Sequence, residues 1–232
     1  MPGARLWMAL NGSTVAGRKI ELIVKDDTGV PDVTKRIAQE LVVNDKVDVL
    51  AGFGLTPLAL ATAPIATQSK TPMVNMLAAT SSVIDASPYM VRVSMTLPQV
   101  TLGIAEWAPK NGIKKAVTLV SDYGPGIDAE RSFRDRFMLN GGQVLESIRV
   151  PMRNPDFAPF LQKVRDLNPE AVFVFVGAGM GGAVMKQFNE RGLAKAGDGI
   201  PMIRSGNTPA DNGPAPAGPA VKTFALASQA LG

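Results

Sequence analysis

Short apolar runs of the kind that form β-strands alternate with helix-patterned segments along most of the chain. Residues 31–45, for example, carry apolar side chains at helix spacing, and Pro31 suits a first helical turn. Strands that alternate with helices form parallel sheets whose two faces are covered by the helices. The sequence therefore predicts an α/β protein, with strands at 20–24, 47–51, 73–76, 90–93, 116–120, 144–150 and 171–176 and helices at 31–45, 56–69, 99–110, 128–139, 157–167 and 183–191.

The predicted strands are too many for one regular sheet in a chain of 232 residues. The alternation is interrupted near Ser94–Pro98, where we expect an extended crossing. We therefore predict lobe 1 at residues 1–94 and lobe 2 at residues 97–208. Residues 209–232 are predicted as a Pro/Gly-rich linker, with a candidate strand at 221–227 that returns to lobe 1.

Composition excludes several classes of function. The chain contains no His and no Cys, which removes thiolate chemistry, zinc sites built on those residues and every His-based triad. Basic residues are spread along the chain and only 6% of residues are aromatic, and both observations argue against a nucleic-acid partner. The sequence shows no apolar stretch of about 18 residues and no signal-peptide pattern at its N-terminus.

Ligands of open α/β sheets bind beyond the carboxyl ends of the strands, so the loops after the strands are candidate sites. Thr56 follows the strand at 47–51 and is placed to cap the next helix. After the strand at 73–76, either Thr80 or Ser81 can cap the helix that follows. Hydroxyls and free N–H groups at two neighbouring helix N-termini suit a small anion such as a carboxylate. A purely structural capping role is the alternative for each threonine, and the sequence leaves both open.

Two further loops carry polar side chains. Tyr123 lies in a Gly/Pro-rich turn, where it can cover an apolar ligand face and donate one hydrogen bond, or pack on its own loop. Asp26 and Asp27 end a predicted strand, where carboxylates can bind a metal or act as bases. A turn is the commoner role for such a pair, and we predict no catalytic and no metal-binding residue.

Residues 171–182, AVFVFVGAGMGG, place G-x-G-x-x-G between a strand and a helix, as a dinucleotide site does. That site also requires an acidic residue at the end of the next strand, but residues 201–204 contain none and Asp198 lies before them. Small residues also let a backbone approach a ligand of another kind closely. An NAD(P)-dependent oxidoreductase is therefore an alternative prediction.

Several segments, taken in order, resemble the type I periplasmic binding proteins, and among them the branched-chain amino-acid (leucine/isoleucine/valine) receptors of ABC transporters. They include AGRKIELIVKDDTGVPDVTKRIAQELVVNDKVDVLAGFG, KKAVTLVSDYGPGIDAERSF and NGGQVLESIRVPMRNPDFAPFLQKVRDLNPEAVFVF. The resemblance covers roughly residues 3–205 and implies two Rossmann-like lobes with parallel sheets that close on a small ligand. It also implies a partial chain, in which lobe 1 lacks its first strand and its C-terminal completion.

The resemblance assigns ligand contacts to four loops, and the predicted ligand-binding residues are Gly54, Leu55, Thr56, Ala78, Ala79, Thr80, Tyr123, Gly177 and Ala178. One departure concerns the ligand. Amino-acid receptors hold a carboxylate near the position of Ser205–Asn207 to bind the ligand's ammonium, and this sequence has no acid there. A buried ammonium without a counter-charge is costly, so a carboxylic acid without an amine is an open option.

The resemblance implies a non-enzymatic function, with no cofactor. The expected protein is the solute-binding protein of an ABC importer, which carries a small amino acid or carboxylate between its lobes and delivers it to a membrane permease. A periplasmic location is expected from the family. Two alternatives stay open, the oxidoreductase that uses the loop at 177–182 and a ligand-sensing regulator built on the same fold.

Overall fold

The computed structural model describes residues 2–152, 155–177, 179–194, 199–205 and 223–226. Lobe 1 contains α1 (Pro2–Asn11), β1 (Thr14–Val15), β2 (Arg18–Lys19), α2 (Pro31–Val43), β3 (Leu50–Gly52), α3 (Thr56–Ser69), β4 (Met73–Asn75), the 3-10 helix η1 (Ser81–Ala86) and β5 (Met90–Arg92). Lobe 2 contains α4 (Leu97–Lys110), β6 (Lys115–Ser121), α5 (Gly124–Leu139), β7 (Gln143–Val150), α6 (Ala158–Leu167), β8 (Ala171–Phe175), α7 (Gly181–Glu190), β9 (Met202–Ser205) and β10 (Thr223–Leu226). Within these ranges, no helix is long and apolar enough to cross a membrane.

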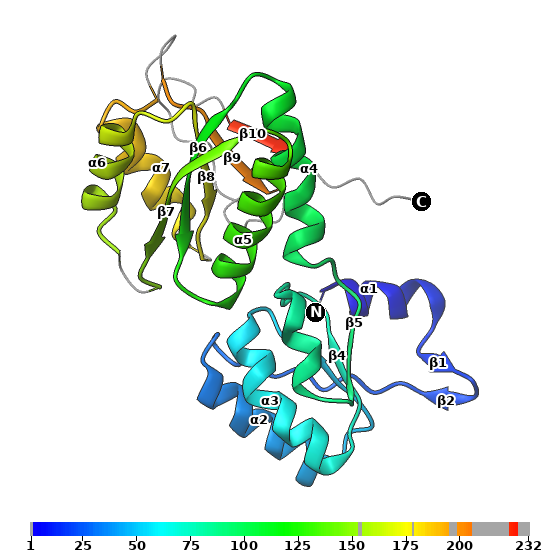
Figure 1. The fold of residues 1–232 in the computed structure, drawn as a ribbon. Helices are drawn as coiled ribbons and strands as arrows, with labels where there is room; N and C mark the ends of the chain where they lie inside the picture. Colours follow the sequence, from blue (N-terminus) through cyan, green and yellow to red (C-terminus); the bar gives the residue numbers. More distant parts are fainter. Residues whose placement is uncertain (1, 153–154, 178, 195–198, 206–222, 227–232) are drawn as a thin grey trace.

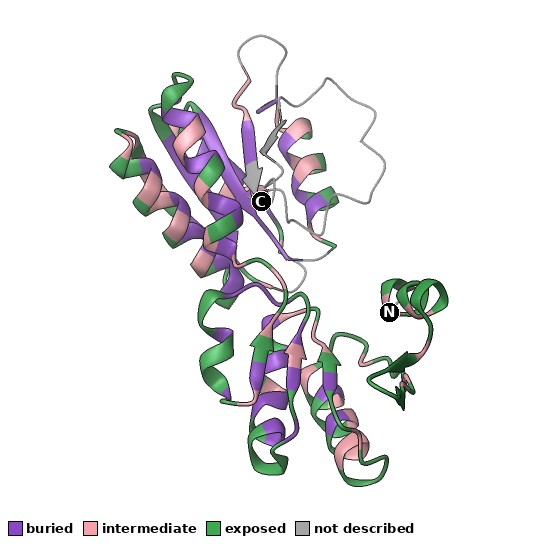
Figure 2. Ribbon diagram, turned by 90° about the vertical axis from the view of Figure 1, so that its right-hand side faces the viewer, coloured by how far each residue is buried: buried purple, intermediate pink, exposed green. Residues whose placement is uncertain are grey.

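The sheet of lobe 1 has three parallel strands in the order β3-β4-β5. Helix α3 packs on it through Ala59, Ala63 and Ala66, which are buried against Leu50 and Met73. Alanines at helix spacing let the helix lie close to the sheet because they carry no side chain beyond Cβ. Figure 2 shows that the buried residues of this half concentrate on the strands and on the helix faces next to them.

The sheet of lobe 2 has five strands in the order β10-β9-β8-β6-β7, all parallel. Successive residues of β8 face opposite sides, as the period of a strand requires. Phe173 packs with α4 and α5 on one face, and its neighbours Val172 and Val174 pack with α6 and α7 on the other. The central strands are therefore buried on both faces, and Figure 1 shows the helices on both sides of the sheet.

Phe133 of α5 is the centre of an aromatic stack in the core of lobe 2. Its ring lies 5.0 Å from that of Phe137 and 4.3 Å from that of Phe173, and all three side chains are fully buried. The stack therefore joins α5 to the middle of the sheet.

Replacing Phe133 with alanine is expected to lower the free energy of unfolding by about 3–5 kcal/mol, because it leaves a cavity inside a closely packed core. Urea denaturation followed by circular dichroism measures this change. Met138→Ala is the matched control, since this side chain of the same helix is 55% exposed and its loss should cost within about 0.5 kcal/mol. A cost below about 1 kcal/mol for Phe133→Ala would contradict the central role of the stack.

The structure confirms the predicted fold class, an α/β protein with parallel sheets, and most predicted elements agree to within a few residues. Two predictions were wrong. The run 20–24 forms no strand, and α5 begins at Gly124 instead of Asp128. The first error arises because β-branched residues favour a strand only where a neighbouring strand pairs with them. The second arises because Gly-Pro-Gly is typical of a loop, although Pro also suits a first helical turn.

The candidate return strand at 221–227 has a different place in the structure. Thr223–Leu226 forms β10, which pairs in parallel with Met202–Ser205 of β9. This segment therefore extends the sheet of lobe 2, because the free edge of β9 offers hydrogen-bonding groups to a parallel partner. The boundaries of the two lobes at 94 and 97, and the linker that begins at 209, stay proposals.

Candidate ligand site at the junction of the lobes

Thr56 and Thr80 meet at the carboxyl ends of β3 and β4. Both side chains are buried, and their hydroxyl oxygens lie 2.8 Å apart. Neither hydroxyl caps a helix: Leu55 occupies the N-cap position of α3, and no side chain caps η1. The capping prediction was therefore wrong. One hydroxyl of the pair donates to the other, which leaves one O–H proton free for a third acceptor.

Asn75 holds the loop that carries Thr80, and the backbone of that loop is hydrogen-bonded to the loop that precedes Thr56. Its side chain, fully buried at the end of β4, donates to the carbonyl of Ala78 (2.8 Å) and accepts from the N–H of Ala78 (3.0 Å). The N–H of Ala78 also points at the carbonyl of Phe53, at 2.9 Å. The sequence analysis missed Asn75, although a polar residue inside an apolar strand is a signal that could have identified it.

Lobe 2 reaches this corner through the first residue of α5. A Cβ atom on Gly124 would lie 3.5 Å from Oγ1 of Thr80 and 3.9 Å from Cγ2 of Thr56. The N-termini of α3 and α5 therefore converge on the threonine pair. Backbone N–H groups in a first helical turn lack helical acceptors and carry partial positive charge, so two converging N-termini favour an anion between them.

Tyr123 lies at the N-cap position of α5, next to Gly124, and packs against the core of lobe 2. Burial raises the pKa of its phenol to about 12. The phenol therefore keeps its proton at neutral pH and can donate a hydrogen bond. Tyr123 directly precedes Gly124, the position at which a Cβ would come within 3.9 Å of both threonines.

The raised pKa of Tyr123 predicts a loss of stability at high pH. The phenol has a pKa of about 12 in the folded protein and its ordinary pKa of 10.0 in the unfolded chain, so between these pH values the unfolded state loses this proton first. The stability contributed by the neutral phenol is present below pH 10 and is lost towards pH 12, at a cost of about 1–2 kcal/mol. Denaturation at pH 9 and pH 11 measures it. Tyr123→Phe is the control and should remove this component of the pH dependence.

Gly177 is tied to Tyr123 through Ser121, a buried residue at the end of β6. The N–H of Gly177 donates to Oγ of Ser121 (3.0 Å), and the N–H of Tyr123 donates to the Ser121 carbonyl (2.9 Å). A Cβ on Gly177 would lie 2.9 Å from Cε of Met180, so the position requires glycine or a shift of that methionine. The sequence analysis missed Ser121 as a site residue, and Ala178 lies outside the described residues.

The other predicted residues surround the threonine pair on its lobe 1 side. Gly54 and Leu55 directly precede α3, and Ala79 accepts a hydrogen bond from the N–H of Leu97 (2.9 Å) at the start of α4. Of the predicted residues that the structure describes, it thus brings together the loops at 54–56 and 78–80 and the turn at Tyr123. Gly177 joins them only through Ser121.

Asp26 and Asp27 have the predicted turn role. Their carboxylates accept from the N–H groups of Thr28 (2.9 Å) and Gly29 (3.0 Å), and Asp27 also accepts from the hydroxyl of Thr34. In the part of the chain that the structure describes, no group of three or more acidic side chains could hold a metal ion.

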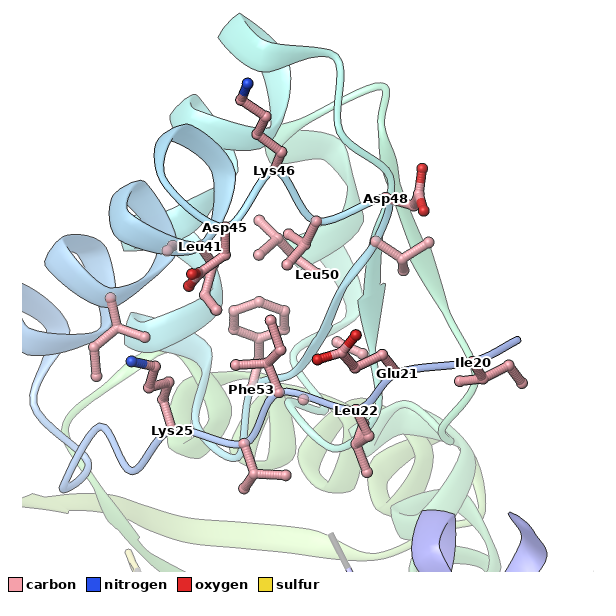
Figure 3. Close-up of a pocket in the computed structure, with 18 of the residues that line it drawn as sticks. Ile20, Glu21, Leu22, Lys25, Leu41, Asp45, Lys46, Asp48, Leu50 and Phe53 are labelled. Atoms are coloured by element: carbon pink, nitrogen blue, oxygen red, sulfur yellow. The ribbon is translucent and has the colours of Figure 1, made fainter. Parts of the chain in front are cut away.

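A separate groove of about 1230 Å³ lies beside β3, between that strand and the extended segment 20–27. Figure 3 shows the side chains of Leu41, Leu50 and Phe53 around it, with Glu21 on the segment across from them. Gly54 is the one predicted ligand-binding residue that also lines this groove. Neither Thr56 nor Thr80 lines the groove, so it is distinct from the corner formed by the threonines.

Comparison with known proteins identifies the family of the chain. The family model "Periplasmic binding protein" matches residues 2–228, so the chain belongs to that family. Leu/Ile/Val-binding protein homolog 6 of Brucella abortus (strain 2308) is 42% identical over 197 residues, which are 84% of this chain and 50% of that protein. The chain thus spans about half the length of the curated relatives it matches. The resemblance to the type I branched-chain amino-acid receptor group is confirmed.

Solved structures give the same fold with ligands bound. A solute-binding protein of an ABC transporter from Rhodopseudomonas palustris BisB5, in complex with 3,4-dihydroxybenzoic acid, is 57% identical with a TM-score of 0.81, covering 88% of this chain and 56% of that one. A second, from R. palustris HaA2 with p-hydroxybenzoic acid, is 38% identical with a TM-score of 0.80 over the same shares. The leucine-binding protein LivK of Thermotoga maritima, 24% identical with a TM-score of 0.74 over 87% of this chain and 56% of that one, shares the fold. None of these findings supports the oxidoreductase.

Proposed function

We propose that this protein is the solute-binding protein of an ABC importer and that its ligand is an aromatic carboxylate of the hydroxybenzoate class. The observation that carries the proposal is the convergence of two helix N-termini on a buried pair of threonine hydroxyls. This arrangement offers N–H and O–H donors, as a carboxylate requires. The 57% identical relative with bound 3,4-dihydroxybenzoic acid supports the choice of an aromatic acid.

In this proposal the ligand's carboxylate lies against Thr56 and Thr80, and Tyr123 contacts its ring. An aromatic side chain and an aromatic ligand interact through offset stacking or edge-to-face packing, and the neutral phenol can donate to a ring hydroxyl. At Gly177 the side chains of Met152 and Met180 occupy the space that a Cβ would enter, so the wall there is formed by backbone and methionine. All nine predicted ligand-binding residues stay part of the proposal.

A standard α-amino acid fits this corner less well because its ammonium needs an acidic partner. Asp128, which lies in the same corner, has both carboxylate oxygens engaged by Ser81, at 2.8 and 3.0 Å. The sequence places no Asp or Glu at 205–207, and positions 206 and 207 lie outside the described residues. These observations favour an acid without an amine.

The partner and location follow from the same proposal. A receptor of this kind delivers its ligand to the membrane permease of an ABC transporter and has no catalytic step and no cofactor of its own. The family implies a periplasmic location.

Isothermal titration calorimetry on the protein in its full encoded length tests the ligand. We expect 3,4-dihydroxybenzoate and 4-hydroxybenzoate to bind with micromolar or tighter affinity, and L-leucine to bind at least about 100-fold more weakly, since burying its ammonium costs several kcal/mol. Thermal unfolding with ligand at about 100 times its Kd should show a stabilisation of about 2.7 kcal/mol. Tight binding of leucine, or no binding of any benzoate, would overturn the ligand assignment.

A further inference from the structure

A hydrogen-bonded contact joins the two lobes next to the threonine pair. Asp128 of α5, in lobe 2, accepts from the backbone N–H of Ser81 (2.8 Å) with one carboxylate oxygen and from the Ser81 hydroxyl (3.0 Å) with the other. Ser81 begins η1 in lobe 1 and directly follows Thr80. A carboxylate that uses both oxygens on one residue fixes both the distance and the orientation of that residue.

Arg92 holds the same loop from inside lobe 1. Its guanidinium donates to the carbonyls of Ala78 (2.7 Å), Thr80 and Ser81 (3.5 Å), and so it fixes three of the four residues from 78 to 81. Burial lowers the pKa of Arg92 and the negative charge of Asp128 opposes that shift, so the two charges are close enough to interact. Arginine suits this role because its planar fork carries five donors, whereas lysine carries a single point charge.

We propose that Arg92 and Asp128 are positioning residues of the ligand site, and that the Asp128–Ser81 contact is a latch that sets how long the lobes stay closed on the ligand. The inference rests on the proposed function and adds residues that control ligand release. Arg92 fixes the conformation of the loop at 78–81 within lobe 1, and Asp128 hydrogen-bonds the last residue of that loop from lobe 2. Thr80 lies in the loop between these two contacts.

The latch forms only when the lobes are closed. Asp128 is one helical turn from Gly124, where a Cβ would lie at van der Waals distance from Thr80. The carboxylate therefore reaches Ser81 only when the N-terminus of α5 is against the threonine pair. Breaking the latch raises the rate of opening, whereas encounter with the ligand depends on the open state and should change little.

The test is stopped-flow binding of 3,4-dihydroxybenzoate to the protein in its full encoded length. Asp128→Asn should raise koff about tenfold and leave kon within about threefold, as expected for the loss of a charged hydrogen bond at a partly exposed site. Arg92→Lys should raise koff by a similar factor. Ser81→Ala should raise koff less, because the backbone N–H remains. Ser81→Thr keeps both donors and should have the wild-type koff.

Asp135→Asn is the matched control, because Asp135 is an exposed acid of the same helix that pairs with Arg131 and Arg134. It should leave koff unchanged. The unfolding temperature of the unliganded Asp128→Asn protein should stay within about 2 °C of wild type, since the latch joins lobes and not the core of either. A wild-type koff in Asp128→Asn, or an equal rise in Asp135→Asn, would overturn the latch.

A second measurement needs no ligand and therefore separates the latch from the proposed function. The chain has no Cys, so spin labels at Gln68→Cys in lobe 1 and Leu139→Cys in lobe 2, both exposed, attach only there. Asp128→Asn should shift the distance distribution between the labels to longer values. An unchanged distribution would disprove the latch, and failure of wild type to bind any carboxylate would disprove only the proposed function.

Discussion

A protein with Thr56→Val is expected to bind 3,4-dihydroxybenzoate about 10- to 100-fold more weakly than wild type, and Thr80→Val is expected to cause a loss of the same order. The two hydroxyls are buried 2.8 Å apart, and together they leave one proton for a ligand oxygen. Valine has nearly the shape of threonine but no donor. The substitution therefore leaves one hydroxyl without the partner that orients its proton towards the carboxylate. Calorimetric titration measures the change in Kd.

The double variant distinguishes a shared site from two independent contacts. Because each hydroxyl depends on the other for its orientation, the combined loss should be smaller than the sum of the two single losses. Thr67→Val is the control, since the hydroxyl of this threonine of the same helix lies within hydrogen-bonding distance of the Ala63 carbonyl and the Ser87 hydroxyl instead. Its Kd should equal that of wild type. Strictly additive losses, or a loss in Thr67→Val, would argue against a common carboxylate site.

The layout of the fold could be predicted from the sequence because it depends on local patterns. Helix periodicity and Pro in the first turn located α2 and α3 nearly to the residue, and the buried apolar run of β8 predicted a central strand. Elements that depend on a distant partner could not be placed in this way. The run 20–24 has strand composition without a paired strand, and 223–226 pairs with β9, which precedes it by about 20 residues.

The candidate site was predictable only in part, for the same reason. The rule that ligands bind at strand ends selected Thr56 and Thr80, because their positions follow from the strand boundaries. The hydrogen bond between their hydroxyls depends on how two loops 24 residues apart pack together, and the sequence does not report that packing. The helix-capping role was inferred from the local sequence alone. In the structure the two hydroxyls hydrogen-bond each other instead of capping a helix.

The residues that support the site were missed altogether. Asn75, Ser121 and Arg92 each lie at the end of a strand and hydrogen-bond the backbone of a loop. Asn75 interrupts an apolar run and so could have been identified, whereas no local pattern distinguishes Arg92 and Ser121. Polar residues at the carboxyl ends of parallel strands are nevertheless the group to inspect, because all three belong to it.

Gly126→Ala is expected to lower the free energy of unfolding by about 3 kcal/mol and to weaken binding of 3,4-dihydroxybenzoate at least about tenfold. A Cβ on Gly126 would lie 1.9 Å from the carbonyl oxygen of Ser121, which is backbone and cannot move aside on its own. The start of α5 must therefore shift away from β6. That shift carries Tyr123 and Gly124 with it and disturbs the Ser121 hydroxyl that holds Gly177.

Gly103→Ala in α4 is the matched control, because a Cβ there meets nothing within 4 Å and the glycine is exposed inside a helix. The same chemical change should stabilise the protein by about 0.5–1 kcal/mol and leave Kd unchanged. Calorimetry also separates the two effects of Gly126→Ala. A weaker Kd with one ligand per protein indicates a displaced helix N-terminus, whereas a lower stoichiometry with the wild-type Kd indicates unfolding alone. The second result would mean that the close approach of α5 to Ser121 does not shape the ligand site.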